Sequence, residues 1–370
     1  MSTRGIVVIA GSLAQRPGYG GHAWFFLQYV HGFRQLGYDV LFLDQLDAPD
    51  PAGMRWLAEV LGDVPWSLRF GAETLGMTRR HVVEKVRESA ILLNVMGYLD
   101  DEEILAAARC RVFLDIDPGF GQMWQALGLA TMFAGHDAYV TIGENIGQPD
   151  CTVPTCGIDW LTTPQPVVLD QWPVRNGASC TAFTTVASWR GPFGPVEYGG
   201  RTYGLRVHEW RRFAALPAAS GQAFEVAMEL DAADAKDRVL LETNGWRLAD
   251  PRTVAGGIGD YREFVSGSRA EVMIAKNMYV ATRGAWFSDR SICYLAAGKP
   301  VLAQDTGFSK YHPTGRGLLA FSTPEEAAEG VKAINADYSA HCRAAREIAE
   351  SQFDSDKVLR RLLEKLEVAM

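Results

Sequence analysis

The chain has 370 residues, 48% of them hydrophobic and 22% charged, and its formal net charge is −8. This length exceeds what one hydrophobic core comfortably serves, so it predicts two domains. The acidic balance argues against a nucleic-acid-binding protein, because neutralising backbone phosphates needs a basic surface. No apolar run approaches the roughly 20 residues that cross a bilayer, so we expect no membrane span.

Cysteine usage is typical of a reducing compartment. The six cysteines form no C-x-x-C pair and show no matched histidine spacing, so we expect no zinc site. The first apolar strand, which follows Arg4, is too short to be the apolar core of a signal peptide. We therefore predict a reduced cytoplasmic protein, and the sequence leaves open whether it forms a homodimer.

The first half alternates between buried-strand patterns and helical periodicity. The predicted strands are 5–12, 38–43, 91–96, 111–116 and 138–142, and the predicted helices are 22–36, 54–61, 79–89 and 102–108. This alternation predicts a parallel sheet with right-handed crossovers. The loop 13–21 contains Gly18, Gly20 and Gly21 but matches neither the dinucleotide fingerprint nor a Walker loop.

Prolines and glycines punctuate residues 147–180, which is typical of a linker. We place a first domain at 1–150, the linker at 151–180 and a second domain at 181–370. In the second domain the pattern predicts strands at 181–188 and 224–230, a further strand at 239–242, and helices at 207–214 and 259–266. Residues 323–335 and 338–366 predict two long amphipathic helices.

The segment 272–307 carries the clearest functional signal. A strand at 272–275 leads through a glycine-containing loop to a predicted helix N-cap, a helix at 289–297 and a strand at 301–303. Such a helix N-terminus points its free N–H groups toward the carboxyl ends of parallel strands, where phosphate is best held. We therefore predict phosphate or donor contacts for Lys276, Arg283, Gly284, Ser288, Asp289, Arg290, Asp305, Thr306 and Gly307.

Two of these residues need a partner if they are buried. Lys276 interrupts an apolar strand, so either a diphosphate or an internal carboxylate should pair with it, and we favour the diphosphate. Arg290 lies in the first turn of its helix, where a cation is unfavourable unless an anion is near.

The same region resembles the donor-binding half of the GT-B glycosyltransferases. The similarity lies in AAGKPV at 296–301, QDTG at 304–307, GRGLL at 315–319 and TPEEA at 323–327. It implies an α/β protein with two Rossmann-like domains facing across a cleft, and C-terminal helices that cross back. It also implies transfer of a sugar from a nucleoside diphosphate sugar, without a further cofactor, to a small-molecule hydroxyl such as that of a natural product. Cys293 departs from the pattern, because retaining members usually carry a ribose-binding glutamate there.

His22 is the candidate catalytic base. It opens the first helix after the glycine loop, where a neutral imidazole can take a proton from an acceptor hydroxyl. The resemblance implies an inverting, metal-independent reaction in which Asp117 or Asp115 orients this histidine. Alternatively, His22 only packs against the start of the helix. As a separate alternative, Asp115 and Asp117 hold Mg²⁺ as a D-x-D pair, although we expect no metal. Glu144 is a second candidate base.

Aromatic residues give weaker signals. Trp246 follows an Asn-Gly turn, and an exposed ring there would stack on a nucleobase. A polar, aromatic patch with Arg206 at the start of a helix either enters the cleft or lies on the surface. Aromatic residues predicted on the first-domain face would suit a lipophilic acceptor, namely Trp24, Phe25, Phe26, Phe120 and Trp124.

A nucleotide-sugar epimerase and a catalytically silent nucleotide-sugar-binding partner remain as alternative functions.

Overall fold

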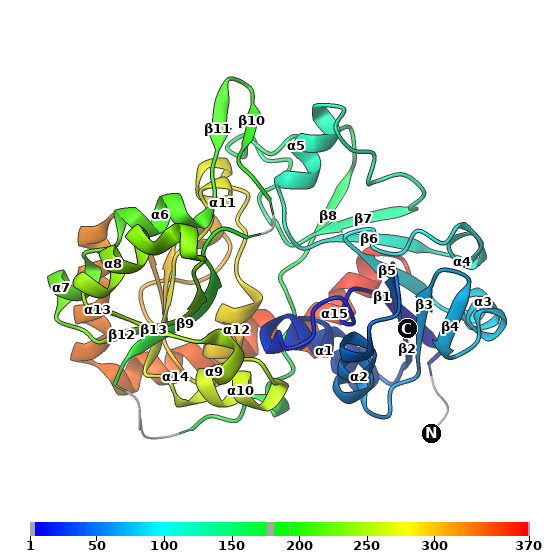
Figure 1. Cartoon of the computed structure of the whole chain (residues 1–370), viewed down its shortest axis with the longest axis horizontal. Helices are drawn as coiled ribbons and strands as arrows, with labels where there is room; N and C mark the ends of the chain where they lie inside the picture. The colour runs from blue at the N-terminus through cyan, green and yellow to red at the C-terminus, as the bar shows by residue number, and fades with distance from the viewer. Residues whose placement is uncertain (1–3, 176–180, 192, 369–370) are drawn as a thin grey trace.

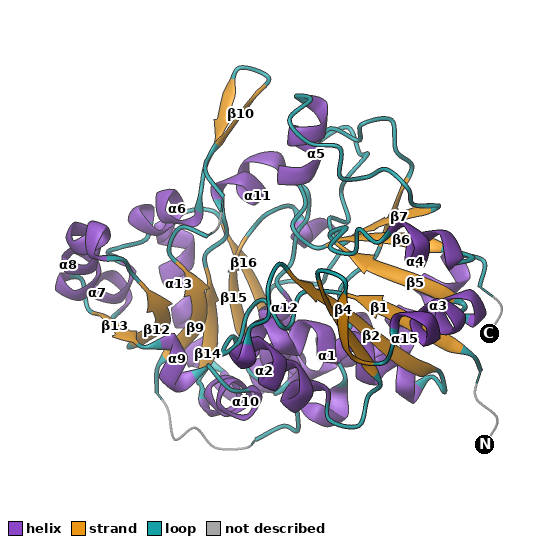
Figure 2. Ribbon diagram, turned by 45° about the vertical axis from the view of Figure 1, so that its right-hand side comes forward, coloured by secondary structure: helices purple, strands orange, loops and turns teal. Residues whose placement is uncertain are grey.

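The chain folds around two β-sheets whose strands are mostly parallel, with helices on their faces (Figures 1 and 2). The computed structural model describes residues 4–175, 181–191 and 193–368. The prediction of two Rossmann-like sheets is confirmed. Among the described residues, no helix combines the length and the apolar character that a membrane crossing requires.

The first sheet has the strand order β4-β3-β2-β1-β5-β6-β7-β8, and all its pairs are parallel except β3–β4. Its strands are β1 (Ile6–Ala10), β2 (Asp39–Leu46), β3 (Trp66–Phe70), β4 (Glu73–Gly76), β5 (Ile91–Val95), β6 (Arg111–Asp115), β7 (Ala138–Thr141) and β8 (Trp160–Thr162). The helices of this half are α1 (Gly20–Gln35), α2 (Pro51–Leu61), α3 (Arg79–Glu88), α4 (Glu102–Ala107) and α5 (Phe120–Ala126).

The second sheet is wholly parallel, in the order β13-β12-β9-β14-β15-β16. Its strands are β9 (Phe183–Ser188), β12 (Phe224–Glu229), β13 (Trp246–Ala249), β14 (Ala270–Met273), β15 (Val301–Gln304) and β16 (Leu318–Phe321), and a separate antiparallel hairpin pairs β10 (Val196–Tyr198) with β11 (Arg201–Tyr203). The helices are α6 (Arg206–Arg212), α7 (Leu216–Ser220), α8 (Ala235–Thr243), α9 (Pro251–Val254), α10 (Ile258–Gly267), α11 (Asn277–Thr282), α12 (Asp289–Ala296), α13 (Pro324–Ala336), α14 (Tyr338–Ile348) and α15 (Ser355–Lys365). Short helical turns lie at η1 (Leu169–Gln171), η2 (Ala232–Asp234), η3 (Phe308–Lys310) and η4 (Ala349–Phe353).

The structure corrects three details of the predicted layout. Residues 239–242, predicted as a strand, belong to α8, whose apolar Val239 is 61% exposed while Leu241 is buried. The predicted helix at 338–366 is interrupted by the π-helical turn η4, so it forms α14 and α15. Strand β8 lies within 151–180, the range predicted as a linker, and extends the first sheet to Thr162. Several further elements had no counterpart among those predicted, namely the antiparallel pairs β3–β4 and β10–β11, the strands β13 and β16, and the helices α5, α7, α9 and α11.

The C-terminal helix crosses back onto the first half, as predicted. Helix α15 packs on α1 so closely that a Cβ atom added to Gly32 would lie 2.5 Å from Leu359 Cδ1. Two crossing segments lie side by side, because Val167 and Asp354 form a parallel bridge. The two sheets are therefore tied together at both the start and the end of the second half.

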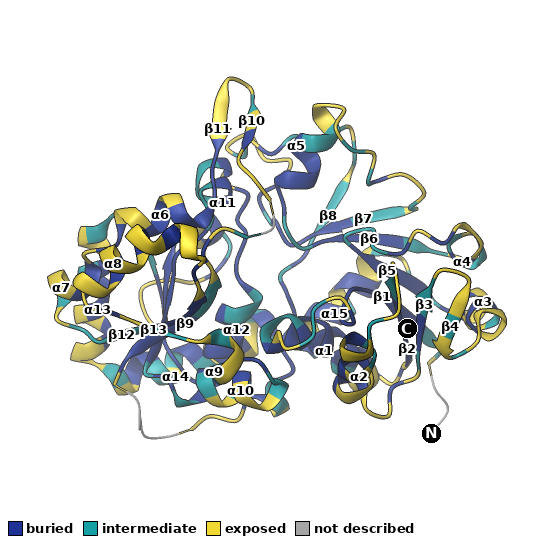
Figure 3. Cartoon of the chain, in the orientation of Figure 1, coloured by how far each residue is buried: buried dark blue, intermediate teal, exposed yellow. Residues whose placement is uncertain are grey.

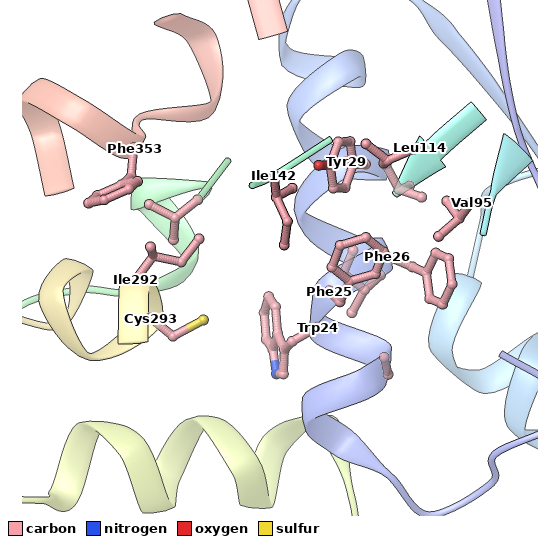
Figure 4. Close-up of a cluster of buried hydrophobic side chains, with 14 of the residues drawn as sticks. Trp24, Phe25, Phe26, Tyr29, Val95, Leu114, Ile142, Ile292, Cys293 and Phe353 are labelled. Atoms are coloured by element: carbon pink, nitrogen blue, oxygen red, sulfur yellow. The ribbon is translucent and has the colours of Figure 1, made fainter. Parts of the chain in front are cut away.

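Helix α1 also joins the two halves through a shared apolar cluster (Figure 4). In this cluster Trp24 of α1 meets Ile292 and Cys293 of α12, and its indole Nε1 donates to the carbonyl of Ile258 at 2.8 Å. Figure 3 shows the inner helices as buried and the outer helix faces as exposed. The predicted aromatic acceptor face is thereby corrected, because its residues Trp24, Phe25, Phe26 and Phe120 are core side chains.

Candidate active site

A cavity of about 480 Å³ lies where the carboxyl ends of both sheets meet. In each sheet the strand order reverses beside the first strand of that half, between β1 and β5 and between β9 and β14. Ligands of open α/β sheets bind at such switch points. The cavity is lined from the first half by Arg16, Gly18, Tyr19, Gly20, Gly21 and His22, and from the second by Val186, Ala187, Ser188, Trp189, Arg190, Gly191, Arg206, Glu229, Asp231, Asp234, Pro251, Arg252, Ala255, Tyr261, Asp289 and Arg290.

The glycine loop forms the first-domain wall by close contact with the second domain. The backbone N–H of Gly20 donates to the carbonyl of Ala255 at 3.1 Å. A Cβ atom at Gly20 would lie 2.4 Å from the carbonyl oxygen of Gly257, so only glycine fits there. These glycines therefore serve the approach of two backbones rather than a dinucleotide fingerprint.

Helix α12 begins at the cavity as the sequence predicts. The hydroxyl of Ser288 caps it by accepting from the backbone N–H of Arg290 at 3.3 Å, and Gly298, at φ 71°, follows its end. Asp289 and Arg290 line the cavity. The guanidinium of Arg290, however, forms an ion pair with the fully buried Glu271 on β14, in which Nε donates to the carboxylate at 2.5 Å.

Arg206 is the buried cation that faces the cavity without such a partner. Its side chain is 7% exposed, and its Nη1 donates to the carbonyl of Ser188 at 3.3 Å. Its Nε has no hydrogen-bond partner, and within the described part of the chain no carboxylate forms an ion pair with it. Burial, and next the nearby charge of Arg290, lower the pKa of Arg206 to about 10, so it stays charged at neutral pH. A buried cation without a counter-ion is costly, which favours an anionic ligand here.

Arg16 supplies positive charge from the opposite wall. It belongs to the glycine loop, lines the cavity and is half-buried. Its charge is near enough to contribute to lowering the pKa of His22. Arg16 and Arg206 therefore bring positive charge to the cavity from different domains.

His22 lines the cavity as a neutral imidazole. Its Nε2 lies 3.1 Å from the carbonyl oxygen of Ser12, which can only accept, so Nε2 carries the proton and Nδ1 keeps its lone pair. Burial and the charge of Arg16 lower the pKa of His22 to about 4. The ring packs edge-on against Phe26, with centroids 5.2 Å apart. His22 is therefore in the protonation state that a base needs.

The aspartates predicted to orient His22 are bonded to other residues in the structure. Asp115 accepts from Gln122 Nε2 at 2.6 Å and from Thr141 Oγ1 at 2.8 Å, and burial raises its pKa to about 6. Asp117 pairs with Lys276 and with the hydroxyl of Tyr279. Lys276 therefore has the internal carboxylate, the alternative that we did not favour, as its partner.

The remaining predicted donor residues hold loops together beside the cavity. Asn145 donates to the carbonyl of Arg283 at 2.9 Å and, through its backbone, to that of Gly284 at 3.2 Å. Asp305 accepts from the backbone of Gly307 at 2.9 Å, and Thr306 donates to the carbonyl of Trp286 at 2.5 Å. Glu144, the second candidate base, lies 2.6 Å from His312 Nε2. The residues Arg283, Gly284, Ser288, Asp305, Thr306 and Gly307 do not line the cavity.

Trp246 is a core residue, which corrects its predicted role as a stacking platform. It is 2% exposed on β13, its indole packs on Trp210 and Phe224, and its Nε1 donates to the carbonyl of Ala214 at 2.8 Å. The Asn-Gly turn before it suggested exposure, but the parallel strand that follows the turn buries the ring.

We expect Trp246→Phe to lower the free energy of unfolding by about 1–2 kcal/mol, because it removes one buried hydrogen bond and leaves a small cavity. The affinity for a ligand of the cavity should stay within about twofold, since the ring lies outside the cavity. Urea unfolding and calorimetry measure the two quantities. A large loss of ligand affinity at unchanged stability would show that Trp246 contacts the ligand after all.

Neither half of the described chain contains a group of three His, Cys, Asp or Glu side chains placed to hold a metal ion. The D-x-D residues Asp115 and Asp117 are engaged in the separate contacts given above. The sequence did not single out Arg16, and it named Arg206 only within a patch that either enters the cleft or lies on the surface. Arg206 shares a signal with Arg290, since both are arginines in the first turn of a helix that follows a glycine-containing loop.

No protein-family model and no curated protein matches the sequence, whereas solved structures match it along its whole length. The HepE protein of Anabaena in complex with UDP-glucose is 14% identical, with 98% of this chain and 100% of that chain covered and a TM-score of 0.61. An alpha-glucosyltransferase in complex with UDP and a 13-mer DNA is 11% identical, with 99% and 100% covered and a TM-score of 0.63. A glycosyltransferase from Rickettsia africae is 11% identical, with 99% and 98% covered and a TM-score of 0.58.

These likenesses define the class of the fold. Two of these neighbours are named as glycosyltransferases and the third is bound to UDP-glucose, and each is covered over nearly its full length. At such low identities the similarity establishes architecture and leaves chemistry to be argued from the site. The prediction of a GT-B fold is confirmed.

Proposed function

We propose that this protein is a glycosyltransferase that moves a sugar from a UDP-sugar bound in the interdomain cavity. The observation that carries the proposal is Arg206, a buried and charged side chain that faces the cavity without a carboxylate partner. The cavity volume of about 480 Å³ suits a ligand of nucleotide-sugar size. The UDP and UDP-glucose bound to structural neighbours support the same donor class.

In this proposal the chain itself offsets the charge of the departing diphosphate. Arg206 and Arg16 contact it from opposite walls, and the N-terminus of α12 adds its partial positive charge. Such preorganised donors can stabilise a diphosphate without a cation, so we propose metal-independent transfer. His22 takes the proton of the attacking acceptor hydroxyl at Nδ1, and attack from the face opposite the diphosphate inverts the anomeric centre.

We propose a small-molecule hydroxyl as the acceptor. The net charge of −8 supports this class, because a nucleic-acid acceptor would need a basic surface. One neighbour was crystallised with DNA, so an acceptor test should include a DNA duplex as a comparison. The cytoplasmic location and a homodimer stay predictions.

Calorimetry and a turnover assay test the donor. We expect UDP to bind at least about tenfold more tightly than uridine, because uridine lacks the phosphates that Arg206 and Arg16 would contact. dTDP and GDP, titrated in parallel, rank the base preference. Equal binding of UDP and uridine would contradict the phosphate site, and no binding of any nucleotide would remove the proposal.

With UDP-glucose, the products distinguish the three functional classes. Free UDP together with a glycosylated acceptor, or with glucose in acceptor-free hydrolysis, supports a transferase. Conversion of UDP-glucose to an isomeric UDP-sugar would indicate an epimerase. Binding without any turnover over a broad acceptor panel would indicate a silent partner protein.

A further inference from the structure

A buried ion pair between Lys276 and Asp117 joins the two domains directly. Lys276 follows β14 of the second sheet, and Asp117 follows β6 of the first, so both lie at the carboxyl ends of their sheets. The ammonium of Lys276 lies 3.0 Å and 2.7 Å from the two carboxylate oxygens of Asp117. The hydroxyl of Tyr279, on α11, donates to the same carboxylate. One carboxylate therefore takes two donors from the other domain.

The surroundings make this contact unlike a surface ion pair. The side chains of Lys276 and Asp117 are only 12% and 20% exposed. The ammonium also lies 5.0 Å from the ring centroids of both Phe120 and Tyr279. Nearby, Gly119 approaches Met278 so closely that an added Cβ would lie 3.0 Å from its sulfur. Figures 1 and 2 place α11 next to α5 at this junction.

A second interdomain ion pair provides a comparison. Lys310 lies 3.1 Å from Asp150, but each of these side chains is 46% exposed. Exposed pairs contribute little, whereas removing one member of a buried pair leaves an uncompensated charge in a dry environment. Moving the two domains apart would let water solvate that charge more fully.

Charges around the pair connect it to the cavity. The electrostatic neighbours of Lys276 include Arg206 and Arg16, which line the cavity from different domains, and those of Tyr279 include Asp115. Asp117 is the carboxylate that directly contacts Lys276, and Asp115 lies behind it, bonded to Gln122 and Thr141. A change in the separation of the domains at this point would change the distance between Arg16 and Arg206.

We infer that Asp117, Lys276 and Tyr279 form an interdomain positioning group that holds the two walls of the cavity at the separation needed to bind one anionic ligand. These are positioning residues, since none of them lines the cavity. Their loss shifts the population toward open domains, and the apparent affinity of a ligand that needs both walls falls by the fraction that remains closed. The inference about closure stands independently of the proposed glycosyl transfer.

The test combines solution scattering of the ligand-free protein with UDP calorimetry. Asp117→Asn and Lys276→Met should each increase the radius of gyration. Each should also weaken UDP binding about tenfold or more, which is the low end of the coupling energies measured for close charge pairs across an interface. The double variant should lose no more than either single variant, because both remove the same contact. Lys276→Arg, which keeps the charge, should restore most of the closure and affinity. Asp150→Asn is the matched control at the exposed pair, and neither quantity should change.

Specific results of the scattering and of the calorimetry would contradict the inference. Unchanged scattering for both single variants would show that the apolar cluster around α1 holds the domains without the ion pair. Additive losses in the double variant would show that Asp117 and Lys276 act separately. If wild type binds no UDP but the variants still open, the ligand proposal fails while the positioning group stands. If UDP binds all variants equally and scattering is unchanged, only the positioning group fails.

Discussion

Replacing Arg206 with methionine should weaken UDP binding by about tenfold to a hundredfold. A hydrogen bond to a charged group typically contributes about 1.5–3 kcal/mol, and each 1.4 kcal/mol corresponds to a tenfold change in Kd. Arg206 has donors for such bonds, since it lines the cavity and pairs with no carboxylate among the described residues. Replacing the side chain of Arg290 should weaken UDP binding less, because its guanidinium already pairs with Glu271. Calorimetry with UDP measures the effect.

The same substitution should leave the ligand-free protein as stable as wild type, or more stable. Arg206 is 7% exposed and lacks a carboxylate partner, so burying its charge lowers the stability of the ligand-free protein. Methionine fills much of the same volume without that cost. Thermal unfolding should therefore show an equal or higher Tm for the variant without UDP, and a smaller rise in Tm on adding UDP. A residue that only supported the fold would show the reverse pattern.

Arg211→Met is the matched control for Arg206→Met. Arg211 lies on the same helix, pairs with Asp237 at 2.9 Å and has a half-exposed side chain outside the cavity. Its loss should leave UDP binding unchanged, with a small loss of stability because a partly buried carboxylate loses its partner. If both variants weaken UDP binding equally, the effect comes from disturbing α6 and Arg206 is not a ligand contact.

The sheet architecture was predictable because local patterns determine it. Buried parallel strands such as β1, β5 and β14 are short, nearly continuous apolar runs, and the helices between them have apolar residues at helical spacing. The serine cap and the glycine after α12 mark both ends of that helix. Segment 239–242 misled the prediction because Val239 and Leu240 are apolar yet exposed, so three apolar residues in a row did not mean a buried strand.

The site was harder to predict because partners come from distant parts of the sequence. Arg206 and Arg290 look alike in the sequence, but Glu271 on a neighbouring strand neutralises only Arg290. Lys276 and Asp117 are separated by 159 positions, and nothing local to either one indicates their contact. Trp246 follows a polar turn and still enters the core, because its burial depends on Trp210 and Phe224. Residue type identified candidates for the site, whereas packing between elements decided which of them are free to bind a ligand.

His22→Ala should lower the rate of single-turnover sugar transfer by about 10²–10⁴-fold, the usual loss when a positioned base is removed. The rate should be the same with and without EDTA, because the proposal assigns the diphosphate charge to Arg206, Arg16 and α12. UDP affinity should change much less than the rate, since the imidazole acts on the acceptor proton. The product should carry the anomeric configuration opposite to that of the donor.

The pH dependence of the transfer rate tests the same role of His22. Burial and Arg16 lower the pKa of His22 to about 4, so the ring is neutral and able to accept a proton from about pH 5 upward. Transfer that depends on His22 should be independent of its titration between pH 6 and 8, and should fall as the pH drops through about 4. Stability has the same sign: the contribution of neutral His22 is complete above its unfolded pKa of about 6.5 and is lost as the pH falls toward 4.

His22→Gln separates the chemical role from packing. Glutamine keeps a polar side chain of similar size at the start of α1 but has no basic nitrogen, so it should lose as much transfer as alanine does. His31→Ala, on the same helix and outside the cavity, should keep wild-type transfer. Recovery of near-full transfer by His22→Gln would show that His22 only supports the glycine loop. A product with the donor's own anomeric configuration would exclude single-step inversion and leave the fold and the diphosphate site in place.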